Sequence, residues 1–201
     1  LRAELANRSR FDDVDQFFNP AAYWRGGGRP APHNLMTDIT KVRKQGVEAR
    51  GYEAALAITG LSFRKAPPST GATCTLVTVP FSQGNTVSWL FDAASRAYAR
   101  SINGEPHVDR ESNRRYTASN VVVLWAKTRQ VRTTKLGGAW MEIVLTGSGR
   151  CSLFREGIRL DGTWVTDGKE PPVFKAADGT QIKLAPGNTW FQVIANDQNI
   201  S

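Results

Sequence analysis

Histidine, cysteine and long apolar runs are all scarce in this chain of 201 residues. Two histidines cannot supply a three-histidine metal centre, and the two cysteines, Cys74 and Cys151, fit no Cys-X-X-Cys spacing. The longest apolar run, 121–126, has six residues, whereas a helix that crosses a bilayer needs about 20. The composition therefore predicts no metal site of the usual kind and no membrane-spanning helix.

Signature motifs of several enzyme classes are missing as well. The chain has no Gly-X-Ser-X-Gly elbow, no Gly-X-X-X-X-Gly-Lys-Ser/Thr phosphate loop, no His-Glu-X-X-His and no Gly-X-Gly-X-X-Gly. These absences argue against the common serine hydrolases, nucleotide-binding enzymes and zinc proteases, and no cofactor is predicted. They leave open catalysis by a less familiar set of side chains.

Positive charge is concentrated in one part of the chain, which carries +8 overall. Residues 93–135 contain nine basic and three acidic side chains, a net charge of +6. Such a cluster raises the local concentration of an anionic partner, whether nucleic acid, lipid head groups or an anionic polymer. A well-solvated basic face explains the same pattern without a partner.

The secondary-structure signals change along the chain. Acidic residues open a helical stretch at 12–18, and Thr37 or Asp38 caps a helix that runs to about Arg50. Beyond residue 72 the chain holds runs rich in Val, Thr, Ile, Phe and Trp, and pairs such as Asn103-Gly104 and Asp161-Gly162 predict tight turns. We therefore predict an α+β protein, with a helix/loop-rich part over 1–66 followed by a mainly antiparallel β domain over 67–201.

A predicted hairpin around the Asn103-Gly104 turn is the strongest candidate for chemistry. Regular pairing would place four side chains on one face, because side chains alternate along a strand: Arg100 opposite His107 and Tyr98 opposite Asp109. A histidine beside a carboxylate can act as a general acid or base, with Arg100 as an anion clamp.

Two alternatives to this catalytic interpretation remain open. His107 and Asp109 can simply satisfy each other or the loop backbone. Pro106 cannot donate to the ladder, so the arm after Gly104 can also peel away from its partner strand.

Two other stretches carry residues suited to binding. Three glycines between Arg25 and Arg29 can form an amide nest for an anion, and His33 and Asn34 follow closely. Basic residues interleaved with aromatic ones continue the hairpin region and suit single-stranded nucleic acid, the basic ones being Arg110, Arg114 and Arg115. A flexible surface loop and half-buried strand aromatics account for the two patterns without a ligand.

An ordered series of short motifs resembles the YerB-like family, bacterial lipoproteins described as a domain of unknown function. The series includes Phe17-Phe18-Asn19-Pro20, Ala31-Pro32-His33-Asn34, Val87-Ser88-Trp89, Tyr98 to Asp109, Ser119-Asn120-Val121, Gly162-Thr163-Trp164 and Pro186-Gly187-Asn188-Thr189-Trp190. The match covers most of the chain from about Phe11.

The resemblance implies a location and a domain organisation. Residues 1–66 would be the latter part of an N-terminal α/β domain that begins upstream, and 67–201 the C-terminal domain. Membrane attachment would come only through a lipid anchor outside this chain, in the extracytoplasmic cell envelope. Such a compartment allows a disulfide between Cys74 and Cys151 and disfavours nucleic acid as a natural partner.

The preferred hypothesis is a membrane-tethered binding module of the cell envelope. It would recognise an anionic envelope component or an envelope protein through the basic hairpin region, and it would adjoin its own upstream segment. One rival is an envelope enzyme, a hydrolase or transferase of cell-wall material, that uses His107, Asp109 and Arg100, with His33 as a further candidate. The other rival is a structural scaffold.

Overall fold

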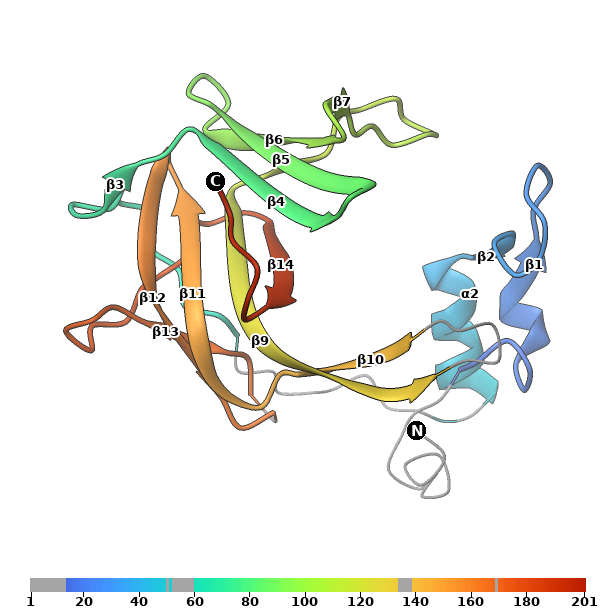
Figure 1. The fold of residues 1–201 in the computed structure, drawn as a ribbon. Helices are drawn as coiled ribbons and strands as arrows, with labels where there is room; N and C mark the ends of the chain where they lie inside the picture. The colour runs from blue at the N-terminus through green and yellow to red at the C-terminus, as the bar shows by residue number, and fades with distance from the viewer. Residues whose placement is uncertain (1–13, 50, 52–59, 134–138, 169) are drawn as a thin grey trace. The chain divides into compact units, whose positions relative to one another are not determined.

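The computed structural model describes residues 14–49, 51, 60–133, 139–168 and 170–201. The chain divides into two compact units, an N-terminal unit of residues 1–58 and a C-terminal unit of residues 59–201 (Figure 1). None of the described helices is long and apolar enough to cross a membrane. The interpretation of 1–66 as the end of a longer domain stays a prediction.

The N-terminal unit consists of two short paired strands followed by a short helical segment. Its elements are the 3₁₀ turn η2 (Pro20–Ala22), strands β1 (Tyr23–Arg25) and β2 (Leu35–Thr37), helix α2 (Ile39–Lys44) and the π-helical turn η3 (Gln45–Ala49). β1 and β2 are antiparallel and flank the glycine loop. Asp38 caps α2, since its side chain accepts from the N–H groups of Thr40 and Lys41.

The prediction of an α+β protein with a helix-rich N-terminal part is wrong. Strands make up 49% of the described residues and helices 8%, so the described part of the protein is mostly β. The aspartates expected to open a helix at 12–18 explain part of the error. Asp15 Oδ1 accepts from the N–H groups of Phe17 and Phe18, so the side chain holds 16–18 in a turn instead.

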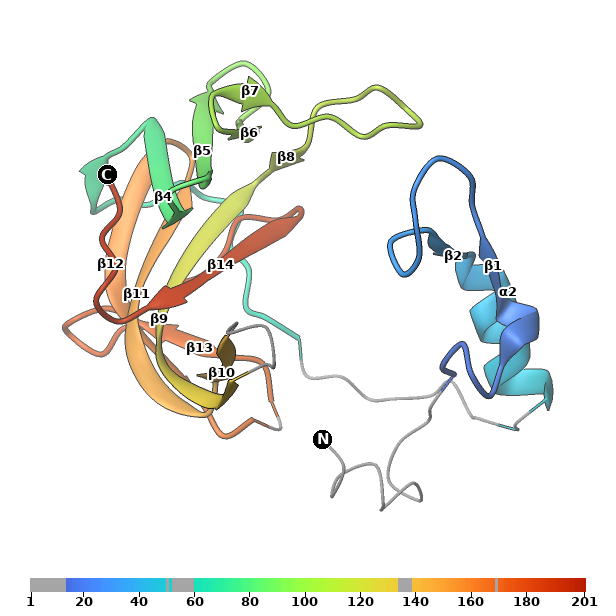
Figure 2. The same ribbon diagram turned by 45° about the vertical axis from the view of Figure 1, so that its right-hand side comes forward.

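The C-terminal unit contains two sheets. The smaller sheet has the order β4 (Leu76–Ser82), β5 (Asn85–Asp92), β6 (Ala97–Ile102), β7 (Glu105–Pro106), and β8 (Thr117–Ala118) also pairs with β6. The larger sheet has the order β10 (Ala139–Val144), β9 (Asn120–Thr133), β11 (Gly147–Arg155), β12 (Ile158–Thr166), β13 (Val173–Lys175). β3 (Ala72–Thr73) pairs with β12, and β14 (Thr189–Ala195) runs parallel to β9 (Figure 2).

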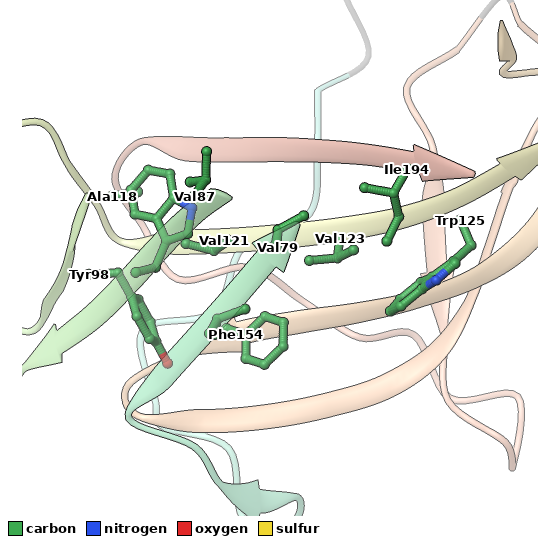
Figure 3. Packing of buried hydrophobic residues seen from close by; sticks show 11 residues of the cluster. Val79, Val87, Tyr98, Ala118, Val121, Val123, Trp125, Phe154 and Ile194 are labelled. Atoms are coloured by element: carbon green, nitrogen blue, oxygen red, sulfur yellow. The ribbon is translucent and has the colours of Figure 1, made fainter. Parts of the chain in front are cut away.

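Strand β9 is the centre of the unit because both of its faces are covered. Val121, Val123 and Trp125 point into a core shared with the smaller sheet (Figure 3). The alternate residues Val122 and Leu124 point into a second core on the opposite face. Burial on both faces explains why this strand reads as an unbroken apolar run rather than an alternating one.

The two cysteines are free, so the disulfide that an extracytoplasmic location would allow is not formed. Cys74 packs against the core that holds Val121 and Val123, whereas Cys151 belongs to the core on the other face of the sheet. The larger sheet therefore lies between the two thiols. Both cysteines belong to the same domain, but they lie on opposite faces of this sheet.

Candidate functional site

Arg100 is a charged residue at a core-facing position of β6. Its neighbours on the same face, Tyr98 and Ile102, are apolar residues of the shared core, and Trp89 of β5 lies directly opposite. Only 8% of Arg100 is exposed. Burying a charged side chain among apolar neighbours is costly unless it has partners. The groups around Arg100 therefore define the site.

Two indole rings that pack against each other lie beside the guanidinium group. Its Cζ lies 4.8 Å from the centre of the Trp190 ring and 5.7 Å from that of the Trp89 ring. The two rings are themselves 5.2 Å apart. Both distances to the guanidinium fall within the range of cation–π attraction, which compensates part of the cost of burying the charge.

A short hairpin inserted into the strand beside β6 completes the site. The chain leaves this strand at His107, whose N–H donates to Arg100 O, and returns at Tyr116, whose carbonyl accepts from Arg100 N. Between them Val108 bridges to Arg115. We call this meeting point the Arg100 junction and define it by Trp89, Arg100, His107, Arg115, Tyr116 and Trp190.

The side chain of His107 contacts Arg100 directly, with Nδ1 facing Nη1. A guanidinium can only donate, so Nδ1 accepts and the neutral imidazole carries its proton on Nε2. Burial, and then the positive charge of Arg100, lower the pKa of His107. The Tyr116 ring packs on the imidazole at 4.6 Å. His107 is therefore held neutral, as an acceptor for Arg100.

Asp109 does not join the other two predicted catalytic residues. Its Oδ1 accepts from the N–H of Ser112 at 2.7 Å and from the Ser112 hydroxyl at 2.8 Å, which caps the turn of the inserted hairpin. These bonds lower the pKa of Asp109. Its Oδ2 accepts from the Tyr116 hydroxyl at 3.2 Å, so it reaches His107 only through that ring. The structure thus pairs Arg100 with His107, and Tyr98, which is fully buried, pairs with Ala118 instead of Asp109.

The remaining basic candidates lie on the surface of the same hairpin. Arg110 and Arg114 are exposed, and Arg115 folds back on the strand. Arg115 Nε donates to Arg100 O at 3.1 Å, and its Nη2 donates to Ser101 Oγ at 2.6 Å. Lys127 and Arg129, from the same basic stretch of sequence, lie on the β9–β10 ribbon at the other end of the unit (Figure 1). The charge excess is thus divided between two surfaces.

The residues predicted in the glycine loop belong to the N-terminal unit. Arg25 donates to Asn34 Oδ1 at 3.1 Å and to Gln16 Oε1 at 3.1 Å, so its guanidinium stabilises the loop between β1 and β2. Arg29 and His33 are exposed on that loop. Among the described residues, no group of three or more His, Cys, Asp or Glu side chains is arranged to hold a metal ion.

Two buried donors at the Arg100 junction, Trp89 Nε1 and Arg100 Nε, have no acceptor among the described residues. A third buried donor without an acceptor among the described residues, Gln192 Nε2, lies farther along β14. Gln192 lies two residues from Trp190 on β14 and, like Arg100, takes a core-facing place in an otherwise apolar series that ends at Ile194. No carboxylate of the described chain forms an ion pair with Arg100. The junction is therefore rich in donors and positive charge and poor in acceptors.

Sequence reasoning missed Trp89, Trp190 and Gln192. Two local signals were available. Arg100 and Gln192 are polar residues at positions where the alternation of a predicted strand calls for an apolar one. Strand β14 reaches this core by pairing with β9, and the paired residues are about 70 positions apart in the chain. No local pattern contains that information.

Comparison with known proteins places the chain in a family. Residues 77–191 match the family described as "Protein of unknown function (DUF3048) C-terminal domain". Over 181 residues the chain is 24% identical to a Bacillus subtilis (strain 168) protein named "Putative lipoprotein YerB", covering 88% of this chain and 52% of that protein.

The fold agrees with a solved structure. The crystal structure of YerB protein from Bacillus subtilis superposes with a TM-score of 0.75 and 24% identity, over 92% of this chain and 61% of that one. The chain spans about half the length of the curated relative. The resemblance predicted from the motif series is confirmed, and the chain belongs to the DUF3048 family, with residues 77–191 forming its C-terminal domain.

Proposed function

We propose that this chain is part of an extracytoplasmic binding module that recognises an anionic group at the Arg100 junction. The observation that carries the proposal is a buried guanidinium without a carboxylate partner, whose own Nε and the neighbouring Trp89 Nε1 have no acceptor among the described residues. Buried donors of this kind are uncommon in folded proteins and ordinarily have an acceptor. An anion with several oxygen acceptors satisfies both the donors and the charge.

The surroundings of the junction supply a route and a second set of contacts. His107, Tyr116 and Trp190 are half-buried, so they form the boundary between Arg100 and solvent. Arg115 is anchored beside Arg100, and Arg110 and Arg114 extend from the inserted hairpin. These exposed cations attract an anion and orient it before the buried guanidinium is reached.

Tethering to the envelope is the second part of the proposal. Its support is the relative whose name describes it as a lipoprotein. An anionic envelope component or an acidic surface of an envelope protein then becomes the natural ligand. The catalytic alternative lacks a direct contact between His107 and Asp109, on which general acid–base chemistry would depend.

Intrinsic fluorescence tests the anion site, because two tryptophans lie beside Arg100. We expect inorganic phosphate, citrate or polyphosphate to change the emission of the wild-type chain in a saturable way that weakens as sodium chloride rises. Arg100→Met should abolish the change. Arg129→Met, which removes an exposed cation of the β9–β10 ribbon, is the matched control and should leave it intact.

Two results would contradict the proposal. One is a response that is the same in the Arg100→Met variant as in the wild type, and the other is no saturable response to any of the three anions. Circular dichroism of both variants establishes that the comparison is made between folded chains.

A further inference from the structure

A cavity of about 640 Å³ in the C-terminal unit shares no lining residue with the Arg100 junction. One wall is the proline-rich segment 66–71, and the opposite wall is the turn and strand-like stretch 176–183. Leu160 and Asp161 of β12 lie between the two walls. The volume is typical of sites that take a small ligand.

The walls are fixed by a buried arginine. Arg155, only 2% exposed, donates from Nη1 to Lys183 O and from Nη2 to Arg64 O and Ala66 O, each at 2.8 Å. Its three acceptors come from both sides of the cavity. In addition, Arg64 N donates to Leu184 O at 2.8 Å. The cavity is therefore preformed, and Arg155 acts as a clamp.

The edge of β12 is incompletely paired where it borders the cavity. On this edge β3 pairs with Ile158 and Arg159, and β13 pairs with 163–165. No described strand pairs with 160–162 on the same edge. Both neighbours turn away here, β3 through Gly71 with a φ of +113° and β13 through the turn at Gly179.

The alternation of peptide groups identifies which main-chain groups face the gap. Gly157 O accepts from Cys74 N, and Arg159 O lies 2.6 Å from the position that a Cβ of Gly71 would take. The carbonyls of 157 and 159 thus point to the β3 side, and every second residue of a strand points the same way. Asp161 is the next in this series, so its N–H and C=O face the cavity.

An unpaired strand segment between two fixed walls is suited to one kind of ligand. We propose that the cavity binds a short peptide in extended conformation, which pairs its own main chain with that of Asp161. Strand addition of this kind takes affinity from main-chain hydrogen bonds and selectivity from side-chain contacts. The rim offers both signs of charge, Arg64 and Lys183 against Asp178, whereas the Asp161 carboxylate is already paired with Arg159. A peptide that carries both an acidic and a basic residue is the best complement.

The test follows the Asp161 amide by ¹H–¹⁵N NMR during titration with blocked hexapeptides of alternating valine and charged residues. One peptide carries Glu and Lys, one only Glu and one only Lys. We expect the mixed peptide to shift the Asp161 amide resonance with a Kd below ~1 mM and to bind best of the three. N-methylation of its central peptide group should weaken binding roughly tenfold or more, because it removes a ladder donor.

Two variants locate the site. Ser69→Trp places an indole in the cavity from an exposed loop position, and we expect it to weaken binding by about tenfold. Gln83→Trp adds the same side chain to the exposed β4–β5 turn and should leave binding unchanged. The proposal is overturned if no peptide shifts the Asp161 amide at about 5 mM. Equal binding by the N-methylated peptide, or displacement of the peptide by inorganic phosphate, also overturns it.

Discussion

Replacing Gly149 with alanine should destabilise the C-terminal unit through contact with a buried tryptophan. Gly149 of β11 lies opposite Trp164 of β12. A Cβ at this position would lie 2.5 Å from Trp125 O and 2.7 Å from Trp164 Nε1. Trp125 O belongs to the strand that is buried on both faces, so the backbone cannot move away. Strand β11 must therefore move away from Trp125 O, and Trp164 must shift as well.

The shift has two energetic consequences. Trp164 is 2% exposed in the second core, and displacing it costs about 1–3 kcal/mol, the usual effect of overpacking. It also loses the hydrogen bond from Trp164 Nε1 to Trp125 O, 3.0 Å long, worth about 1 kcal/mol. The free energy of unfolding should fall by about 2–4 kcal/mol, a large share of the ~5–15 kcal/mol of an ordinary domain.

Urea denaturation followed by tryptophan fluorescence measures the effect. With a slope of about 2 kcal/mol per M, we expect the midpoint to fall by about 1–2 M. Gly84→Ala is the matched control, because a Cβ there meets nothing within 4 Å and the backbone has no positive φ. A midpoint for Gly149→Ala within ~0.3 M of the wild type would refute the reasoning.

Three other predictions concern side chains described above. The pKa of His107 is lowered from 6.5 in the folded protein, so the unfolded chain binds more protons below that pH and the free energy of unfolding falls on acidification. In urea melts between about pH 7 and pH 5, His107→Gln should therefore lose less stability than the wild type. Asn120→Ala removes three hydrogen bonds, two with Ala185 and one with Thr189, and should lower the free energy of unfolding by about 2–4 kcal/mol, whereas a change below ~0.5 kcal/mol would contradict this assignment. Cys74 should react with a thiol reagent in the native protein, while Cys151, whose pKa burial raises to about 12, should react only on unfolding; equal labelling rates would show otherwise.

Local signals predicted local features of the fold. The Asn103-Gly104 turn is confirmed, since both residues have positive φ between β6 and β7, and Asp38 caps the helix that follows it. The contact of Arg100 with His107 follows from that turn and the two-residue period of a strand. Each of these features depends on residues fewer than ten positions apart.

Features that depend on distant contacts were not predictable in the same way. Asp161-Gly162 was expected to form a turn but lies inside β12, where a Cβ on Gly162 would approach Lys175 O to 2.2 Å. The glycine serves close packing with another segment rather than a bend. Asp109 lies on the inserted hairpin and is turned toward Ser112 rather than His107, which the alternation of residues does not reveal.

The hairpin inserted at the Arg100 junction can change without changing the strands that support it. The main-chain bonds of Arg100 close the sheet at His107 and Tyr116, so the register of β6 is independent of how many residues lie between them. Loops of other lengths and charges can therefore be exchanged at this point while the two cores keep their packing. Such a joint marks residues 108–115 as the segment to exchange when the anion binding proposed for the junction is to be altered without rebuilding the sheet.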